Sequence, residues 1–202
     1  MNTILFKNAN IILENQILYG NLLVKGDKIF SITTKDLEAP EGCQIIDLHG
    51  DYLSPGFIDV HTHGGGGYDF MDGDLDSIYQ ACQMHMKHGT TTIVPTTITS
   101  TKESLYEFVQ LFNQVDPHKK GCPNIPGLHL EGPYFSYDQR GAQDPKYLRN
   151  PEKEEYEKVF SLTDRILRWS FAIELEGSSQ CFKYTWHCQF PGSFRCYLPG
   201  SD

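Results

Sequence analysis

The sequence lacks several features that mark whole classes of proteins. It contains no run of about 18 apolar residues, so we expect no segment that spans a membrane. Residues 1–20 show no basic start followed by an apolar block, so we expect no secretory signal. Basic residues are scarce, with 17 Lys and Arg against 26 Asp and Glu and a net charge of -9. Such a chain has no general attraction to nucleic acid or anionic lipid, and we expect neither as a partner.

Paired cysteines and common catalytic motifs are missing as well. None of the six cysteines lies in a Cys-x-x-Cys pair, so a zinc finger or a thioredoxin-like protein is a weak interpretation. Without an export signal, we expect reduced thiols in a cytoplasmic protein. The chain contains neither a Gly-x-Ser-x-Gly nucleophile motif nor a lysine-containing phosphate loop. The glycine run 64–67 lacks the spacing of dinucleotide-binding folds, and it is either a close backbone approach to a site or a flexible connector.

What is present is enough to build a core. Hydrophobic residues make up 39% of the 202 residues, which argues against a disordered chain and allows one or two domains. The first 50 residues predict a small antiparallel β-sheet, with a hairpin turn at residues 25–28. No chemistry is evident in this part, and we expect it to be structural.

From Pro55 onward, strand-like apolar runs alternate with helical patterns. Gly89 suits a left-handed helix end, and Ser100 with Glu103 has the spacing of a capping box. Such alternation predicts parallel strands joined by crossover helices. Periodicity alone allows either an open α/β sheet or the first half of a (β/α)8 barrel. The expected strands are 57–60, 91–94, 125–130 and 166–172, and the expected helices are 75–88, 105–115 and 151–159.

Two histidines directly follow the first of these strands. His61 and His63 lie two residues apart, so in an extended chain their side chains share one side. They stand at the carboxyl end of the strand, where α/β barrels place their sites, and Glu131 ends the third strand in the same way. Imidazole and carboxylate groups suit a divalent metal, although a bare histidine pair is also compatible with a hydrogen-bonded loop. With no nucleophile motif in the chain, metal-assisted hydrolysis is the best-supported reaction class.

Several other polar residues keep more than one interpretation. His129 would be a metal ligand, a partner of a ligand or a packed core histidine. Arg140 and Gln143 follow the third strand and offer donors to a polar or anionic substrate. His85 and His88 on the first expected helix are interpreted as surface or helix-end residues.

Five segments of the chain form a recognisable set. They are Ile-Asp-Leu at 46–48, Pro-Gly-Phe-Ile-Asp-Val-His-Thr-His-Gly at 55–64, His-Gly-Thr-Thr-Thr with Pro-Thr at 88–96, His-Leu-Glu-Gly-Pro-Tyr at 129–134 and Arg-Gly-Ala at 140–142. Together they resemble the N-acetylglucosamine-6-phosphate deacetylases of the amidohydrolase superfamily. The resemblance covers about residues 1–177, and the His-Leu-Glu-Gly-Pro-Tyr segment is its most specific part. It implies an α/β fold, a (β/α)8 TIM barrel with a small β-sandwich built from both chain ends.

The resemblance also implies a reaction. Members of that family hydrolyse the acetamido group of N-acetylglucosamine 6-phosphate, giving glucosamine 6-phosphate and acetate in cytoplasmic amino-sugar catabolism, usually as homodimers. A divalent metal polarises the amide carbonyl, and a late aspartate serves as general base. We expect zinc first, with iron, cobalt, manganese or nickel as alternatives, and a phosphorylated amino sugar as the small-molecule partner.

Individual roles carry over only where residues match. Glu131 matches the family's metal-binding glutamate, and His61 and His63 match a histidine pair that some members use for a second metal. Ala142 and Gln143 match a substrate-contacting pair. Many members have histidine in place of Gln143, and glutamine can donate a hydrogen bond but cannot be cationic.

The resemblance ends at Gly177. We therefore expect part of a β-sandwich at 1–53, the first half of the barrel with about four strands at 54–177, and an unassigned tail at 178–202, for which a frameshift is our hypothesis. The family's two further metal histidines and its catalytic aspartate have no counterpart, so we assign no catalytic residue. We expect a truncated or frameshifted product without deacetylase activity of its own. The alternatives are a non-catalytic fragment that binds metal weakly and another metal-dependent amidohydrolase, such as a dihydroorotase-like enzyme.

Overall fold

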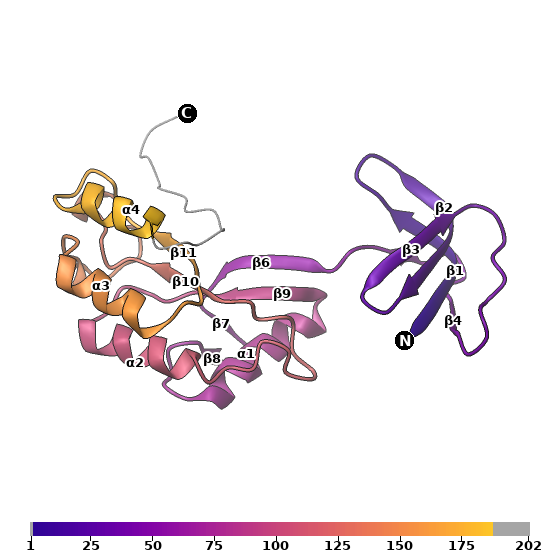
Figure 1. Ribbon diagram of the computed structural model, residues 1–202, viewed down its shortest axis with the longest axis horizontal. Helices are drawn as coiled ribbons and strands as arrows, with labels where there is room; N and C mark the ends of the chain where they lie inside the picture. The colour runs from indigo at the N-terminus through magenta and orange to yellow at the C-terminus, as the bar shows by residue number, and fades with distance from the viewer. Residues whose placement is uncertain (1, 188–202) are drawn as a thin grey trace. The chain divides into compact units, whose positions relative to one another are not determined.

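A computed structural model describes residues 2–187 of the chain (Figure 1). The chain divides into two compact units, Met1–Pro55 and Gly56–Asp202. Each unit has a core of its own, and each is described by itself. The domain division between residues 53 and 54 stays a prediction.

The first unit is a five-stranded sheet in which β1 is the central strand. The sheet mixes antiparallel and parallel pairs, because β1 pairs antiparallel with β2 but parallel with β4 and β5. The expectation of a purely antiparallel sheet is wrong for these last two strands. After β3, a long connection carries the chain back before β4 begins, which is what a parallel neighbour requires. The strands are β1 (Thr3–Ile12), β2 (Ile17–Lys25), β3 (Lys28–Thr33), β4 (Gln44–Asp47) and β5 (Tyr52–Leu53).

The predicted hairpin turn between β2 and β3 is confirmed. Lys25 pairs with Lys28, and Gly26 between them has a φ of 61°. A positive φ is the conformation for which glycine has no steric penalty, so the turn chemistry of the sequence is used as expected. One side of the sheet buries a small apolar cluster centred on Ala9, Ile11 and Leu22.

The second unit is built on four parallel strands that follow one another in chain order. β6 (Phe57–Thr62) pairs with β9 (Thr90–Pro95), and β10 (Leu128–Glu131) pairs with β11 (Ile166–Ser170). Parallel bridges from Thr92 to Asn124 and from Thr96 to His129 join the two pairs. The carboxyl ends of β6 and β10 therefore lie at the same edge of this strand array.

Helices follow these strands in alternation, as the sequence predicted. After β6 comes a short hairpin of β7 (Gly64–Gly65) and β8 (Tyr68–Asp69). Within residues 2–187, no helix has both the length and the apolar character needed to cross a bilayer. The helices are α1 (Leu75–Lys87), α2 (Lys102–Phe112), α3 (Lys153–Leu162) and α4 (Ser178–His187), with single 3-10 turns η1 (Tyr137–Gln139) and η2 (Pro145–Tyr147).

The helix ends follow local hydrogen-bond chemistry. Gly89 has a φ of 94°, as expected for the residue that stops α1. The predicted capping residue Ser100 is wrong by one position, because Thr101 Oγ1 accepts a hydrogen bond from Ser104 N at 3.1 Å. α4 occupies the start of the segment 178–202, to which we assigned no fold from sequence, and residues 188–202 of that segment lie outside the described part.

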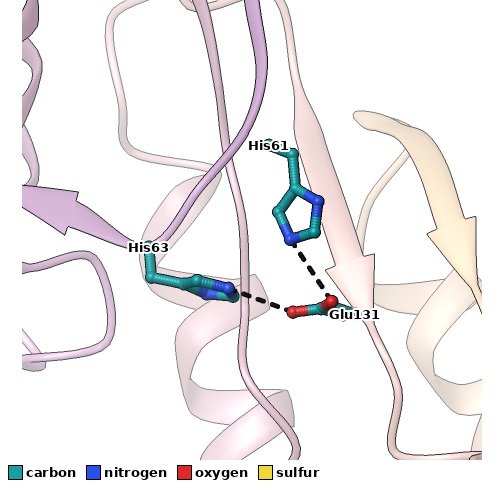
Figure 2. Close-up of side chains that lie close together, drawn as sticks. All are labelled: His61, His63 and Glu131. Carbon is teal, nitrogen blue, oxygen red and sulfur yellow. Dashed lines mark ion pairs between the residues drawn. The ribbon is translucent and has the colours of Figure 1, made fainter. Parts of the chain in front are cut away.

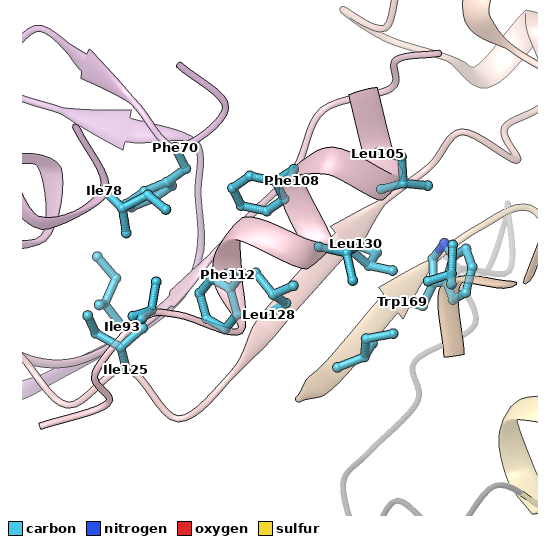
Figure 3. Packing of buried hydrophobic residues seen from close by; sticks show 14 of the residues in the cluster. Phe70, Ile78, Ile93, Leu105, Phe108, Phe112, Ile125, Leu128, Leu130 and Trp169 are labelled. Carbon is cyan, nitrogen blue, oxygen red and sulfur yellow. The ribbon is translucent and has the colours of Figure 1, made fainter. Parts of the chain in front are cut away.

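The core of the second unit lies between the strands and their helices (Figure 3). Phe108 and Phe112 on α2 belong to one buried cluster with Leu128 and Leu130 on β10. Trp169 on β11 is fully buried in the same cluster. Its Nε1 donates a hydrogen bond to Gly132 O at 2.9 Å. That bond connects the core to the turn that follows Glu131. The position of this turn, at the strand edge where the polar residues lie, therefore depends on the packing of Trp169.

Candidate metal centre

Three residues predicted as metal ligands meet at the carboxyl edge of the parallel strands (Figure 2). His61 lies on β6, His63 just beyond its end, and Glu131 is the last residue of β10. His61 Nε2 lies 3.3 Å from Glu131 Oε1, and His63 Nε2 lies 3.0 Å from Glu131 Oε2. One ligand atom from each residue falls within 4.8 Å of the others. The structure thus brings together residues that are about 70 positions apart in sequence.

The electrostatics of the three residues are coupled. The Glu131 side chain is 16% exposed. Burial favours a raised pKa for this carboxyl, but the contacts with His63 and His61 outweigh burial and lower it. The contact with Glu131 in turn raises the pKa of His63 above its ordinary value. The carboxylate is therefore held charged between two imidazole nitrogens.

The donor set fits a divalent metal ion. Two imidazole nitrogens and a carboxylate oxygen are ligands that zinc and similar ions accept. Glu131 Oε2 and His63 Nδ1 are buried, and within the described residues Nδ1 makes no hydrogen bond, while Oε2 has only the contact with His63 Nε2 at 3.0 Å. A buried carboxylate oxygen can accept more than one partner, and coordination of a cation would supply a further one.

The backbone around Glu131 is held firmly in place. Glu131 N donates to Thr97 Oγ1 at 3.0 Å, and Gly132 N donates to Ser170 O at 3.0 Å. Gly132 has a φ of 74°, and a Cβ at this position would stand 2.3 Å from Thr99 Oγ1. Only glycine fits this turn, which fixes where the Glu131 carboxylate emerges.

His129 is a packed core histidine in this structure. It is fully buried, with Nδ1 3.2 Å from Thr96 Oγ1 and Nε2 2.8 Å from Ser170 Oγ. Burial, aided by the nearby charge of Arg168, lowers its pKa to about 3, so the ring is neutral. Both ring nitrogens have partners, which leaves no lone pair for a metal. The centroid of its ring lies 4.8 Å from that of the His61 ring in an edge-to-face arrangement, so His129 packs against a predicted ligand.

The two residues predicted to contact substrate lie on the loop after β10. Gln143 is 8% exposed, and its Oε1 accepts a hydrogen bond from Thr99 N at 3.0 Å. Ala142 beside it is exposed. A cavity of about 450 Å³ opens between this loop and the candidate ligands. Its walls include His61, Glu131, Arg140, Gln143, Arg168 and Ser170.

A buried ion pair holds this loop against α3. Arg149 lies at the end of the loop, and its guanidinium contacts the Glu155 carboxylate at 2.6 to 3.1 Å. Glu155 is 1% exposed. Arg149 Nη1 also donates to Ser100 O and Tyr147 O, each at 2.8 Å. The bond to Ser100 joins the loop to the segment that precedes α2, and Thr99 of the same segment donates the hydrogen bond to Gln143.

Sequence reasoning missed His85, which it interpreted as a surface or helix-end residue. His85 Nε2 lies 2.9 Å from Gly64 O, and Gly64 directly follows the predicted ligand His63. A helical signal was available, because His85 follows the buried residues Ala81 and Ile78 by four and seven positions on α1. His88, by contrast, is exposed at the end of α1, as expected.

The chain resembles known proteins along most of its length. The sequence profile of the amidohydrolase family matches residues 52–172. An N-acetylglucosamine-6-phosphate deacetylase from Caenorhabditis elegans is 31% identical, over 89% of this chain and 45% of its own length. An N-acetylgalactosamine-6-phosphate deacetylase from Escherichia coli O157:H7 is 27% identical, over 72% of this chain and 39% of its own length. The chain spans about half the length, or less, of the curated relatives it matches.

Solved structures agree with these relatives. A D267A mutant of N-acetyl-D-glucosamine-6-phosphate deacetylase from Mycobacterium smegmatis, in complex with N-acetyl-D-glucosamine-6-phosphate, superposes with a TM-score of 0.79. It is 26% identical and aligns with 96% of this chain and 50% of its own. The N-acetylglucosamine-6-phosphate deacetylase of Pasteurella multocida gives a TM-score of 0.76 at 30% identity, again over 95% of this chain and 50% of its own.

Proposed function

The chain belongs to the amidohydrolase family, and on this premise we propose that the activity of the whole protein is the metal-dependent hydrolysis of an N-acetylated amino-sugar phosphate. The substrate we propose is N-acetylglucosamine 6-phosphate, and the products are glucosamine 6-phosphate and acetate. The convergence of His61, His63 and Glu131 within 4.8 Å carries this proposal, because it supplies a metal-binding set where the family's chemistry requires one.

The architecture supports the same proposal. Four parallel strands in chain order, with helices between them, are what the first half of a (β/α)8 barrel provides. The sheet of the first unit is proposed as part of a small β-sandwich. We keep the division at residues 1–53, 54–177 and 178–202, in which the last segment lies outside the family resemblance.

His61, His63 and Glu131 are proposed to hold a divalent ion, with zinc first and iron, cobalt, manganese or nickel as alternatives. Such an ion, when bound, polarises an amide carbonyl and lowers the pKa of a water molecule. The protein's own part is to keep the ligands in reach. Glu131 stays ionised because its two histidine neighbours lower its pKa, and the backbone bonds at Thr97 and Ser170 fix its position.

The loop after β10 is proposed to bind and orient the sugar phosphate. Gln143 is buried and its Oε1 is held by Thr99 N, so the amide nitrogen is the end that can donate to substrate. Arg140, in the same cavity wall, offers a charge-assisted donor for an anionic group. The exposed Ala142 leaves room beside them. No general base is assigned in this chain, and we expect that the chain alone does not turn over substrate.

A hybrid enzyme tests this function. Residues 1–177 of this chain would replace the matching segment of the Caenorhabditis elegans relative. We expect acetate release from N-acetylglucosamine 6-phosphate by the zinc-loaded hybrid, and no release by the same hybrid carrying Glu131→Gln. Assaying N-acetylgalactosamine 6-phosphate in parallel defines the sugar. A folded, zinc-binding hybrid that releases no acetate from either sugar would contradict the proposal.

The two remaining alternatives give different outcomes in the same experiment. A non-catalytic fragment that binds metal weakly would leave the hybrid inactive and its zinc affinity low. Another amidohydrolase would leave the sugar phosphates intact but hydrolyse a different amide, such as dihydroorotate. Turnover by the unmodified chain with zinc would contradict our expectation that it is inactive alone. A cytoplasmic homodimer is proposed from the resemblance only, and light scattering on the purified protein tests the dimer.

A further inference from the structure

We propose that His85 is a positioning residue that fixes the backbone carrying His61 and His63. Nothing in its sequence context assigned it a role, yet it is the one side chain of α1 that reaches β7 through a hydrogen bond in the described part of the chain. The inference rests on the proposed metal site and deepens it, because it names what holds two of the three ligands in place.

The contacts of His85 are to the segment between and beyond the two ligands. Its Nε2 lies 2.9 Å from Gly64 O and 3.3 Å from Thr62 Oγ1. These partners flank His63 on both sides in sequence. The carbonyl of Gly64 can only accept, so the ring carries its proton on Nε2 when this bond forms. One imidazole thus contacts the side chain of the residue directly before a proposed ligand and the backbone of the residue directly after it.

Asp59 extends the same support to His61. His85 Nδ1 lies 3.7 Å from Asp59 Oδ2, a contact that is an ion pair only when the ring is protonated on both nitrogens, and Asp59 Oδ1 accepts a hydrogen bond from His61 N at 3.0 Å. The side chains of His85 and Asp59 are 24% and 29% exposed, so neither swings freely in solvent. Between them, these two residues contact the backbone or side chain at positions 61, 62 and 64.

The glycine run makes this approach possible. A Cβ on Gly65 would stand 3.0 Å from His85 Nε2 and 3.2 Å from its Cδ2, tighter than side chains normally pack. A Cβ on Gly64 would stand 2.1 Å from Tyr68 O. The run is therefore a close backbone approach and not simply a flexible connector, which decides between the two interpretations that the sequence left open.

Partners that orient metal ligands contribute measurably to metal affinity. Their loss typically costs about 10- to 100-fold in affinity, because the free ligands then sample more orientations. Asparagine at position 85 would place its amide nitrogen near the Nδ1 position, too short to reach Gly64 O. Glutamine would place a donor near the Nε2 position. The two substitutions are similar in polarity and differ in reach, so they separate positioning from a general effect on folding.

The test is zinc affinity of the full chain, measured by competition with a chromophoric chelator. We expect His85→Asn to weaken zinc binding by about 10-fold or more and His85→Gln to stay within about 3-fold of the unsubstituted chain. His88→Asn is the matched control, because His88 is exposed on the same helix, and we expect no change. Urea unfolding of each zinc-free variant shows whether the folded population is the same.

A second variant covers the case in which His85→Asn does not fold. Gly65→Ala keeps the histidine but places a Cβ against its ring, and we expect it also to weaken zinc binding. The proposal is overturned if folded His85→Asn, or folded Gly65→Ala, binds zinc as tightly as the unsubstituted chain, or if glutamine is no better than asparagine. Glu131→Gln separates the two proposals. Zinc binding that survives Glu131→Gln refutes the metal site, whereas its loss there with normal affinity in His85→Asn refutes only the role of His85.

Discussion

Replacing Arg149 with methionine should destabilise the second unit strongly. The guanidinium contacts both oxygens of a carboxylate that is 1% exposed, so the substitution leaves the Glu155 charge buried without its main partner. Removing one member of a buried ion pair costs about 3 to 5 kcal/mol. Two backbone carbonyls, of Ser100 and Tyr147, also lose a donor, each worth about 1 kcal/mol.

One compensation lowers this range. Lys102 Nζ lies 3.7 Å from Glu155 Oε2, and its side chain is 36% exposed, so a cation remains nearby but partly in solvent. We therefore take about 3 kcal/mol for the broken pair, the lower end of its range, and with the two lost carbonyl bonds we expect a total loss of about 5 kcal/mol. Urea unfolding measures it from the midpoint and slope of the transition.

A double-mutant cycle identifies the cause of that loss. Replacing both Arg149 and Glu155 by apolar residues removes the pair without leaving a buried charge, which is often close to neutral. We expect the double variant to be more stable than Arg149→Met alone, with a coupling energy of about 2 kcal/mol or more. A loss below about 1 kcal/mol in Arg149→Met, or strictly additive effects, would refute the reasoning.

Two further predictions use the backbone and the thiols. Gly132→Ala should lower the free energy of unfolding by about 2 kcal/mol or more, because a residue with a φ of 74° gains a Cβ 2.3 Å from Thr99 Oγ1. Gly121→Ala is the control, because Gly121 has a φ of 84° but open space around the added Cβ, and it should cost clearly less. Equal losses in the two variants would contradict the steric argument. Burial raises the pKa of Cys82 to about 12, whereas Cys43 is only half-buried. In a variant whose two cysteines beyond residue 187 are replaced by serine, a thiol reagent at neutral pH should label Cys43 at least about tenfold faster than Cys82. Comparable labelling rates for the two thiols in folded protein would show that Cys82 is not protected.

Strands and helices of the second unit were largely predictable from sequence. Each expected strand and helix through residue 172 has a counterpart within a few residues, because apolar runs and helical spacing directly determine what can be buried. The structure places the capping residue of α2 one position after the predicted one. Ser100 and Thr101 both carry a hydroxyl, and only the course of the backbone in the folded protein selects between them.

Features that depend on distant partners were not predictable. The parallel pairing of β4 and β5 with β1 depends on how the chain returns, which local pattern does not record. α4 is a ten-residue helix that packs on α3 through Tyr184. The centroid of the Tyr184 ring lies 5.4 Å from that of Tyr156 and 5.7 Å from that of Phe160. Helices of this length are marginal in isolation, so their formation depends on that packing.

In the candidate site, too, some features were predictable from sequence and others depend on distant partners. His61, His63 and Glu131 were chosen because strand ends of parallel sheets meet at one edge, and the structure places them together. The state of His129 and the contacts of His85 depend on particular hydroxyl and carbonyl groups from other elements. His85 was interpreted from sequence as a surface or helix-end residue, although its spacing from Ala81 and Ile78 fits the buried face of α1, and no local pattern shows which backbone atom its ring contacts.

The most direct test of the metal site is X-ray absorption at the zinc edge of the chain loaded with one equivalent of zinc. Three protein ligands from two histidines and a glutamate predict a shell of nitrogen and oxygen at about 2.0 to 2.1 Å, with the scattering of two imidazoles and no sulfur. The same spectrum should be lost in Glu131→Gln. A sulfur shell at about 2.3 Å, or an unchanged spectrum in Glu131→Gln, would show that zinc binds elsewhere, for example at the cysteines, and would contradict the account.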